Sequence, residues 1–301
     1  MLMLIRARHG MKPRVTDMNI TFVCTGNTCR SPMAEGLFKK IIEEKKLDGI
    51  TCSSCGIYAF AGDTATPEAV EAVRGMGADI SAHRSRPFSE YIADETDLFV
   101  CMTPSHAQAV KNVAPQKKIT VLGGGVADPY GGDGEIYASC AAEIQYHLEI
   151  LADLIIMKTV PFSEAHVEGI AKIEKECFSA PWSEDSIRAE LDNENAHFLV
   201  ALAGEKVLGY IGVHEIVGEA YVANVAVSPK YRRFGIASVL LGEAEKGAKE
   251  RGCEFISLEV RQSNVPAISL YEKRGYTVRG VRKNFYSDPT EDGIIMTLDL
   301  G

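Results

Sequence analysis

The sequence lacks a long apolar run, an excess of positive charge and a regular cysteine pattern, and each absence excludes a class of protein. No run approaches the ~18 apolar residues that a membrane-spanning helix needs. Acidic residues number 41 against 32 lysines and arginines, a formal net charge of −9, so nucleic acid and anionic membranes should repel the chain. The eight cysteines are irregularly spaced, unlike a secreted disulfide framework. We therefore expect a cytoplasmic protein with free thiols, with neither nucleic acid nor membrane as partner.

The composition is that of an ordinary globular protein. Of the 301 residues, 46% are hydrophobic and 24% are charged, and a chain of this length predicts about two domains. In the opening segment MLMLIRARHGMKPRVTD the apolar residues precede the arginines, the reverse of a secretory signal peptide. We expect residues 1–18 to be a disordered extension, with an upstream start codon as the alternative origin of residues 1–17.

Residues 19–157 have the pattern of a parallel α/β domain. A strand-like run from Asn19 leads through a short polar loop to Pro32, which should open an amphipathic helix. Further strand-like runs at 49–55, 97–102 and 118–122 alternate with helical patterns, which is typical of a parallel sheet covered by helices. A helical stripe from Ile136 to Ile155 should close the domain, and residues 158–163 should form a short link.

Residues 158–301 have a different pattern. Two helix-like stretches, near 164–178 and 183–191, precede strand patterns at about 196–203, 206–215 and 219–227, which are joined by short hairpin turns. A glycine-containing loop, a helix, a strand at 255–260, a helix around 266–274 and closing strands follow. This order predicts a mixed antiparallel and parallel α/β domain.

The segment C-T-G-N-T-C-R-S has the features of an anion-binding loop. It lies between a strand and a helix N-terminus, where inward-facing backbone N–H groups and partial positive charge can hold a phosphate. The same field should favour a thiolate at Cys24. Arg30 can bind two phosphoryl oxygens, and Ser31 can donate a hydrogen bond to the thiolate. The predicted phosphate-binding residues are Thr25, Gly26, Asn27, Thr28, Cys29, Arg30 and Ser31.

The longer string ITFVCTGNTCRSPMAEGLF resembles the low-molecular-weight protein tyrosine phosphatase family, and the resemblance covers about residues 19–156. The segment A-D-P-Y places Asp128 where that family has its general acid. The resemblance implies a phosphotyrosine phosphatase I-like fold, a four-stranded parallel sheet with helices on both faces. It also implies Cys24 as the nucleophile, Arg30 as the phosphoryl clamp, and Asp128 as the group that protonates the leaving group and later activates water.

Thr28 indicates which substrate the loop would accept. Its position usually holds a bulkier aliphatic residue in the tyrosine-specific members, and threonine there resembles the bacterial protein-arginine phosphatases. The segment D-P-Y-G-G with Ile136 and Tyr137 is similar to the same branch, so phosphoarginine is the expected substrate and phosphotyrosine the alternative. Arsenate reductases share the loop but need two further neighbouring cysteines, and Cys101 stands alone in its region.

The remaining thiols and imidazoles have simpler interpretations. Cys29 could form a reversible disulfide with Cys24 or be a packed thiol, and the sequence leaves both open. Cys52 and Cys55 form a C-x-x-C without a second pair at ligand spacing, so a buried pair on a strand is favoured over zinc. The histidines are scattered. We expect no metal.

A second anion-binding pattern occurs in NVAVSPKYRRFGIASVLL. Here a strand passes through a basic loop into an amphipathic helix. Small residues at Gly235 and Ala237 allow backbone N–H groups to approach a pyrophosphate, and Arg232 and Arg233 add positive potential.

Together with LEVRQSNVPAISLYEKRGY, with N-F-Y and with the closing D-G-I-I-M-T-L, this string resembles the GNAT acetyltransferases, and closely the ribosomal-protein-alanine N-acetyltransferase (RimI-type) branch, over about residues 158–301. The resemblance implies the acyl-CoA N-acyltransferase fold and acetyl-CoA as co-substrate. It departs from the common pattern at Arg232, where glutamine is usual, and at Ala237, where glycine is usual. The implied acetyl-CoA-binding residues are Val225, Ala226, Val227, Arg233, Phe234, Gly235, Ile236, Ala237, Ser238 and Asn264.

The same resemblance makes Glu259 the general base and Tyr271 the general acid. The chemistry requires such a pair, because an N-terminal ammonium must lose a proton before it attacks a thioester and the departing thiolate must gain one. Without the surrounding sequence that matches the family, the simpler interpretation would be that Glu259 is a surface glutamate and Tyr271 a packed tyrosine.

The two resemblances together predict a bifunctional enzyme. One domain would dephosphorylate phosphoproteins, and the other would acetylate the N-terminal alanine of the eighteenth small-subunit ribosomal protein. The partners are therefore phosphoprotein substrates and a ribosomal protein N-terminus. The alternatives are a phosphotyrosine-specific phosphatase joined to a GNAT domain that acts on another amine, or one domain that serves only as a docking module.

Overall fold

The computed structural model describes residues 17–301, and they divide into two compact units, the first ending at Ile156 and the second beginning at Met157. Most of the predicted extension, residues 1–18, lies outside the described residues. Met18 is already the first residue of a strand, where its backbone N–H donates to Gly49 O.

The first unit contains a four-stranded sheet. Its strands lie in the order β2-β1-β3-β4, and every pairing is parallel, which confirms the predicted fold of this domain. The three later strands lie within one residue of their predicted ends. The elements are β1 (Met18–Cys24), α2 (Arg30–Lys45), β2 (Ile50–Gly56), α3 (Pro67–Arg74), α4 (Glu90–Glu95), β3 (Leu98–Cys101), α5 (Pro104–Val113), β4 (Lys118–Val121), η1 (Leu122–Gly124) and α6 (Gly134–Ile156).

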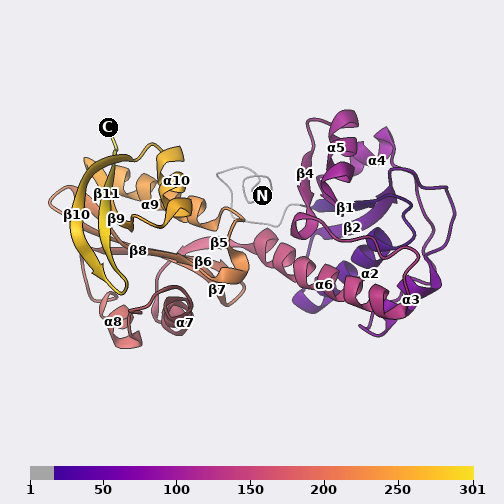
Figure 1. Ribbon diagram of the computed structural model, residues 1–301, viewed down its shortest axis with the longest axis horizontal. Helices are drawn as coiled ribbons and strands as arrows, with labels where there is room; N and C mark the ends of the chain where they lie inside the picture. Colours follow the sequence, from indigo (N-terminus) through magenta and orange to yellow (C-terminus); the bar gives the residue numbers. More distant parts are fainter. Residues whose placement is uncertain (1–16) are drawn as a thin grey trace. The chain divides into compact units, whose positions relative to one another are not determined.

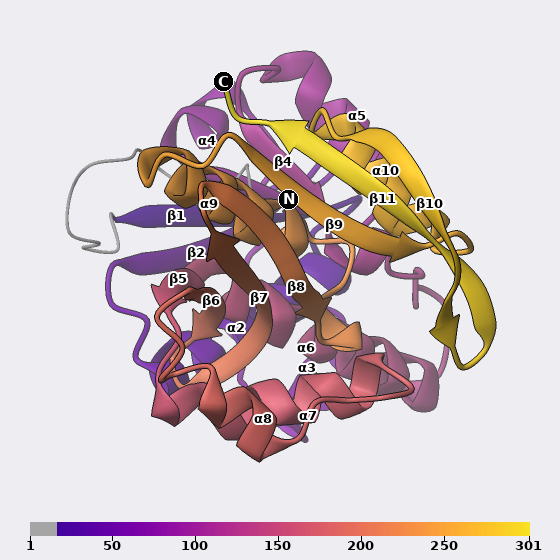
Figure 2. The same cartoon turned by 90° about the vertical axis from the view of Figure 1, so that its left-hand side faces the viewer.

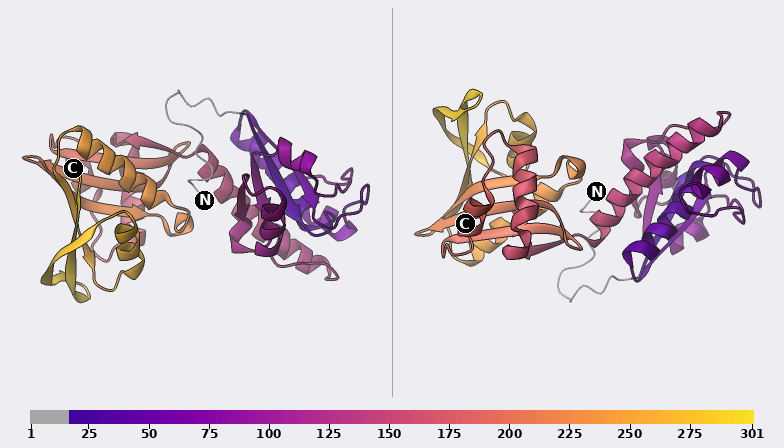
Figure 3. Two further views of the ribbon diagram at one scale, coloured as in Figure 1. Left: turned by 90° about the horizontal axis from the view of Figure 1, so that it is seen from above. Right: turned by 90° about the horizontal axis from the view of Figure 1, so that it is seen from below.

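Helices cover both faces of this sheet (Figure 1). Successive side chains of a strand point to opposite faces, and β1 shows the consequence. Phe22 packs edge-on against Phe38 of α2, with ring centroids 5.6 Å apart, whereas Val23 joins the cluster that holds Ile92 of α4 and Val110 of α5. The helices α2 and α6 lie side by side (Figure 3). The loop between β1 and α2 thus leaves the centre of a sheet that is packed on both faces.

The second unit contains a seven-stranded sheet in the order β10-β11-β9-β8-β7-β6-β5. All of its pairings are antiparallel except the one between β8 and β9, so the predicted mixed fold is confirmed. The elements are β5 (Lys158–Pro161), η2 (Glu164–His166), α7 (Val167–Cys177), α8 (Glu184–Ala189), β6 (Ala196–Ala203), β7 (Lys206–Ile216), β8 (Glu219–Val227), η3 (Pro229–Tyr231), α9 (Ile236–Glu250), β9 (Phe255–Arg261), α10 (Val265–Lys273), β10 (Thr277–Ser287) and β11 (Thr290–Asp299).

The predicted link at 158–163 is wrong, because Lys158–Pro161 form the edge strand β5. Thr159 pairs with Ala201 and Val160 with Val200 of β6. The run K-T-V-P does not alternate polar and apolar residues, and the backbone hydrogen bonds that β6 offers are what make it a strand.

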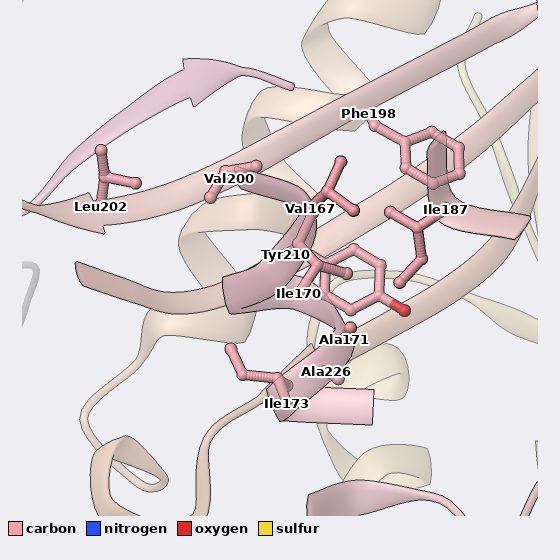
Figure 4. Packing of buried hydrophobic residues seen from close by; sticks show 10 residues of the cluster. All are labelled: Val167, Ile170, Ala171, Ile173, Ile187, Phe198, Val200, Leu202, Tyr210 and Ala226. Atoms are coloured by element: carbon pink, nitrogen blue, oxygen red, sulfur yellow. The ribbon is translucent and has the colours of Figure 1, made fainter. Parts of the chain in front are cut away.

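One face of the second sheet packs against α7 and α8 (Figure 4). Tyr210 of β7 and Phe198 of β6 stack with ring centroids 6.5 Å apart, and Ile170 and Ile187 bring the two helices onto them. The helix α9 contacts β6, β7, β8 and β9. The helices therefore hold the central strands between them.

The pairing between β8 and β9 stops early. Their parallel register runs only from Glu219 opposite Phe255 to Tyr221 opposite Ser257, although β8 continues to Val227. Beyond that point the two strands diverge (Figure 2). The final residues of β8 therefore have no register partner on β9, and this part of the strand can pair with an extended ligand instead.

Candidate active sites

A pocket of about 230 Å³ lies at the carboxyl end of β1. The predicted anion-binding loop forms most of it. Asp128, which is about 100 residues further along the chain, completes it, together with Tyr130 of the same segment. The lining residues are Cys24, Thr25, Gly26, Thr28, Cys29, Arg30, Asp128 and Tyr130.

The loop is formed by a left-handed turn followed directly by a helix. Asn27 has a φ of 56°, a conformation that asparagine tolerates better than most residues. The helix begins at Arg30, two residues before the predicted Pro32. The backbone N–H groups of a first helical turn have no acceptor within the helix, so proline, which lacks an N–H, fits at the third position as well as at the first. The N-cap residue Cys29 makes no side-chain cap hydrogen bond. The first N–H groups of α2 thus remain available to an anion.

Cys24 lines the pocket and is 3% exposed. Its Sγ is 3.0 Å from Ser31 Oγ and accepts a hydrogen bond of 3.3 Å from the backbone N–H of Asn27. The expectation that the loop favours a thiolate needs correction. Burial raises the pKa of the Cys24 thiol, and the hydrogen bonds from Ser31 and Asn27 and the charge of Arg30 offset this rise only in part.

The charge of Arg30 is already engaged. Its guanidinium is 5% exposed, donates 3.1 Å to Val126 O, and forms an ion pair with the carboxylate of Asp128. The Asp128 side chain is about half exposed. A phosphoryl group that enters the pocket would therefore compete with Asp128 for Arg30.

Sequence reasoning missed the group of residues that holds the loop in place. Asn27 is fully buried, and its Nδ2 donates to Ser31 Oγ and to Ser54 Oγ, 2.9 Å each. The backbone N–H of Arg86 donates 2.8 Å to Asn27 Oδ1, and His83 Nε2 lies 2.8 Å from Asn27 O. These residues come from β2 and from the segment after α3, and no motif in the sequence connects them to the loop.

Cys29 and Thr25 make contacts outside the loop. Cys29 Sγ is 3.3 Å from the hydroxyl of Tyr137, a packed-thiol contact, and burial and this thiol raise the pKa of Tyr137 to about 12. Thr25 Oγ1 is 2.9 Å from His106 Nε2 on α5, and burial lowers the pKa of His106.

A second pocket, of about 570 Å³, lies where β8, the basic loop, α9 and α10 meet. Six predicted cofactor-binding residues line it, whereas Val225, Ala226, Phe234 and Asn264 do not. Asn264 instead caps α10, where its Oδ1 accepts from the backbone N–H of Ala267 at 3.3 Å. The lining residues are Val227, Tyr231, Arg232, Arg233, Gly235, Ile236, Ala237, Ser238, Val265, Pro266, Ser269, Leu270 and Lys273.

The basic loop presents the N-terminus of α9 to this pocket. Arg233 and Gly235 have φ values of 68° and 90°, so the chain turns sharply before the helix. The N-cap residue Gly235 has no side chain to cap the first turn. The N–H groups of the first turn and two arginines therefore face one cavity, an arrangement suited to a pyrophosphate. The α10 wall was missed because its apolar residues are spaced like those of any amphipathic helix.

The predicted acid–base pair lies elsewhere in the same unit. Glu259 is on β9 opposite Ile295, and its carboxylate accepts 2.8 Å from Arg282 Nη1. Tyr271 is on α10 and 5% exposed; burial and neighbouring Tyr286 raise its pKa. Its hydroxyl makes no hydrogen bond to another described residue. Neither Glu259 nor Tyr271 lines the 570 Å³ pocket.

Cys52 and Cys55 lie on β2, where residues three apart point to opposite faces. Cys55 is buried and Cys52 only half-buried, so the prediction of a buried pair is correct for Cys55 alone. Among residues 17–301, no group of three or more His, Cys, Asp or Glu side chains could hold a metal ion. Over the same residues, no helix combines the length and apolar character of a bilayer span.

Comparison with known proteins divides the chain in the same way. Residues 19–160 match the family model described as low molecular weight phosphotyrosine protein phosphatase, and residues 167–276 match that of the acetyltransferase (GNAT) family.

Individual relatives each match one half. A protein-arginine-phosphatase of Bacillus subtilis is 39% identical over 144 residues, which cover 45% of this chain and 95% of the relative. A ribosomal protein bS18-alanine N-acetyltransferase of Escherichia coli is 34% identical over 130 residues, which cover 42% of this chain and 87% of the relative. The crystal structure of the Escherichia coli enzyme of that name is 29% identical and covers 48% of this chain and 94% of that chain, with a TM-score of 0.46.

Proposed function

Since residues 19–160 belong to the low molecular weight phosphatase family and residues 167–276 to the GNAT acetyltransferase family, we propose that this one chain catalyses both a phosphoprotein dephosphorylation and an N-terminal acetylation. The observation that carries the proposal is that each unit has its own pocket, lined in part by the N-terminus of a helix. A ribosomal acceptor implies that the enzyme acts in the cytoplasm.

In the phosphatase, Cys24 is the nucleophile and Arg30 the clamp. The phosphoryl group displaces the Asp128 carboxylate from Arg30. The Cys24 proton passes to that carboxylate while Ser31 and the backbone N–H of Asn27 stabilise the sulfur. The sulfur forms a bond to phosphorus while the bond to the leaving group breaks, and Asp128 gives its proton to the departing atom. Asp128 then takes a proton from water, whose oxygen displaces the sulfur and releases inorganic phosphate. Arg30 holds the equatorial oxygens throughout.

We propose phosphoarginine as the substrate of this pocket. Thr28 lines it, and a small polar side chain there leaves space for a planar guanidinium. The Bacillus subtilis relative is named for the same activity. Phosphotyrosine is the second candidate, because the matching family model is described by that substrate.

In the acetyltransferase, the residues present fit acetyl-CoA. The uncapped first turn of α9 and the two arginines suit its pyrophosphate. Beyond Tyr221, the edge of β8 that faces away from β7 has no register partner and can pair with the amide-containing arm. When bound, acetyl-CoA supplies the acetyl thioester. Glu259 takes the proton of the acceptor ammonium, and Tyr271, whose hydroxyl makes no hydrogen bond to another described residue, gives its proton to the departing thiolate.

The proposed acceptor is an N-terminal alanine of a ribosomal protein, which is what the Escherichia coli relative is named for. A test is to assay the purified full-length chain against phosphoarginine, phosphotyrosine and arsenate, and against acetyl-CoA with peptides that begin in alanine. We expect phosphoarginine hydrolysis and alanine acetylation from one preparation. Absence of either reaction from an intact chain would refute the proposed activity of its unit.

A further inference from the structure

An arginine outside the cofactor pocket holds one of its walls. Arg274 follows α10, and its side chain lies on α9, where Nε donates 2.8 Å to Glu245 Oε1 and Nη2 pairs with Glu245 Oε2. Its Nη1 donates to Ser238 O at 3.0 Å and to Ser238 Oγ at 3.1 Å. The Arg274 and Glu245 side chains are 19% and 12% exposed. This is a fixed, bidentate contact and not a loose surface pair.

The sequence of α9 is shaped to receive this side chain. Ser238, Gly242 and Glu245 are spaced four and three residues apart, so they share one face of the helix. A Cβ at Gly242 would lie 3.1 Å from Arg274 Nη2. Because Gly242 has no side chain, the Arg274 guanidinium has room to lie between Ser238 and Glu245.

The contact with Ser238 has a consequence for the pocket. A guanidinium can only donate, so the Ser238 oxygen must accept, and the hydroxyl proton must point elsewhere. That proton has no acceptor among residues 17–301. Ser238 is also in the first turn of α9 and lines the 570 Å³ cavity, beside the uncapped backbone N–H groups.

We propose that Arg274 is a positioning residue for the cofactor, which sets the Ser238 hydroxyl as a hydrogen-bond donor to the pyrophosphate bound at the N-terminus of α9. This inference rests on the proposed use of acetyl-CoA and adds a residue that does not itself touch the ligand. The carboxylate of Glu245 accepts from Arg274 Nε and Nη2 and neutralises the charge of Arg274, whereas Nη1 alone contacts Ser238.

Substitutions of Arg274 and of Glu245 should then change the KM for acetyl-CoA differently. Arg274→Met should raise the KM for acetyl-CoA about tenfold, because the charge-assisted bond that orients Ser238 is lost, with kcat nearly unchanged. Arg274→Lys should recover part of this loss. Glu245→Gln leaves the Ser238 contacts in place and removes a negative charge near a polyanion, so KM should stay equal or fall. If Arg274 only stabilised the fold, both substitutions would weaken binding.

The test is steady-state kinetics of these variants in the full-length chain, with acetyl-CoA and with acetylpantetheine, which has no pyrophosphate. Arg274→Met should be at a disadvantage only with acetyl-CoA, and combining it with Ser238→Ala should add little to either single change. Equal losses with both donors, or additive losses in the double variant, would overturn the proposal. Thermal unfolding of each variant identifies a folding defect.

Calorimetry of acetyl-CoA binding to the wild type and to Arg274→Met distinguishes failure of the proposed acetyltransferase function from failure of the proposed role of Arg274. No binding at all would refute the proposed acetyltransferase function itself. Binding that Arg274→Met leaves unchanged would refute only the role of Arg274.

Discussion

The two pockets of this chain are built in different ways, and the difference decides what a sequence can reveal. In the phosphatase unit, six of the eight lining residues fall in one run, Cys24 to Arg30. In the acetyltransferase unit, the lining comes from β8, a loop, α9 and α10, and Glu259 is on a further strand. A site made by one short loop is fixed by local sequence, whereas a site made by several elements depends on how they pack.

The compact site should be the easier one to abolish, because one atom carries its covalent chemistry. Replacing the thiol in Cys24→Ser should lower the phosphatase rate by roughly 10⁴-fold or more, since a hydroxyl is a far weaker nucleophile. The measurement is turnover of a phosphorylated substrate by the full-length variant. Turnover within tenfold of wild type would remove Cys24 from the mechanism.

The dispersed site should show a smaller and pH-dependent loss. Glu259→Gln should slow acetyl transfer about 100-fold near neutral pH. Since an α-amino group has a pKa of about 8, raising the pH supplies free amine and should partly restore the rate.

Tyr271→Phe serves as the matched control for that rescue. Because the pKa of Tyr271 is raised above its usual value, this group stays protonated across the pH 6–10 range, and its loss should not be repaired by raising the pH. Rate profiles over that range for both variants measure the contrast. If raising the pH restored the rates of both variants equally, or restored the rate of neither, the assignment of base and acid would be contradicted.

Asp128 gives a third comparison, because its carboxylate compensates the charge of Arg30. Asp128→Asn should slow dephosphorylation about 100-fold. The same change leaves Arg30 without its anionic partner, which should lower the pKa of the Cys24 thiol and so speed its alkylation at neutral pH.

Iodoacetamide labelling of the Cys24 peptide, followed by mass spectrometry across pH, measures this effect. Cys24→Ser provides the blank. Labelling no faster than in the wild type would show that the Arg30–Asp128 pair does not control the thiol.

The smallest effect concerns specificity. Thr28→Ile fills part of the pocket and should shift the ratio of rates from phosphoarginine toward phosphotyrosine by about tenfold, or 1.4 kcal/mol in transition-state energy. The ratio of kcat/KM for the two substrates measures it. A wild-type chain that already prefers phosphotyrosine tenfold would exclude the arginine specificity.

The sequence predicts both folds, because alternating strands and helices and a run of hairpins leave clear patterns. It misses β5, since Lys158–Pro161 become a strand only by pairing with β6. It predicts the loop from Cys24 to Ser31 but not its supports, Ser54, His83 and Arg86. Those residues meet Asn27 only after the fold has formed.

The sequence also does not predict the direction of the pKa shift of Cys24. Inward N–H groups and a nearby arginine suggest a low pKa for Cys24, but burial of the thiol and the ion pair of Arg30 with Asp128 were not visible in the sequence. Burial depends on packing from several elements, so only the structure gives the direction of the shift.

The central claim is that one chain carries two separate active sites. The most direct measurement is both reaction rates on the same full-length preparations of wild type, Cys24→Ser and Glu259→Gln. We expect the wild type to catalyse both reactions and each variant to lose only its own. A wild type that lacks one reaction, or a folded variant that loses both, would contradict it.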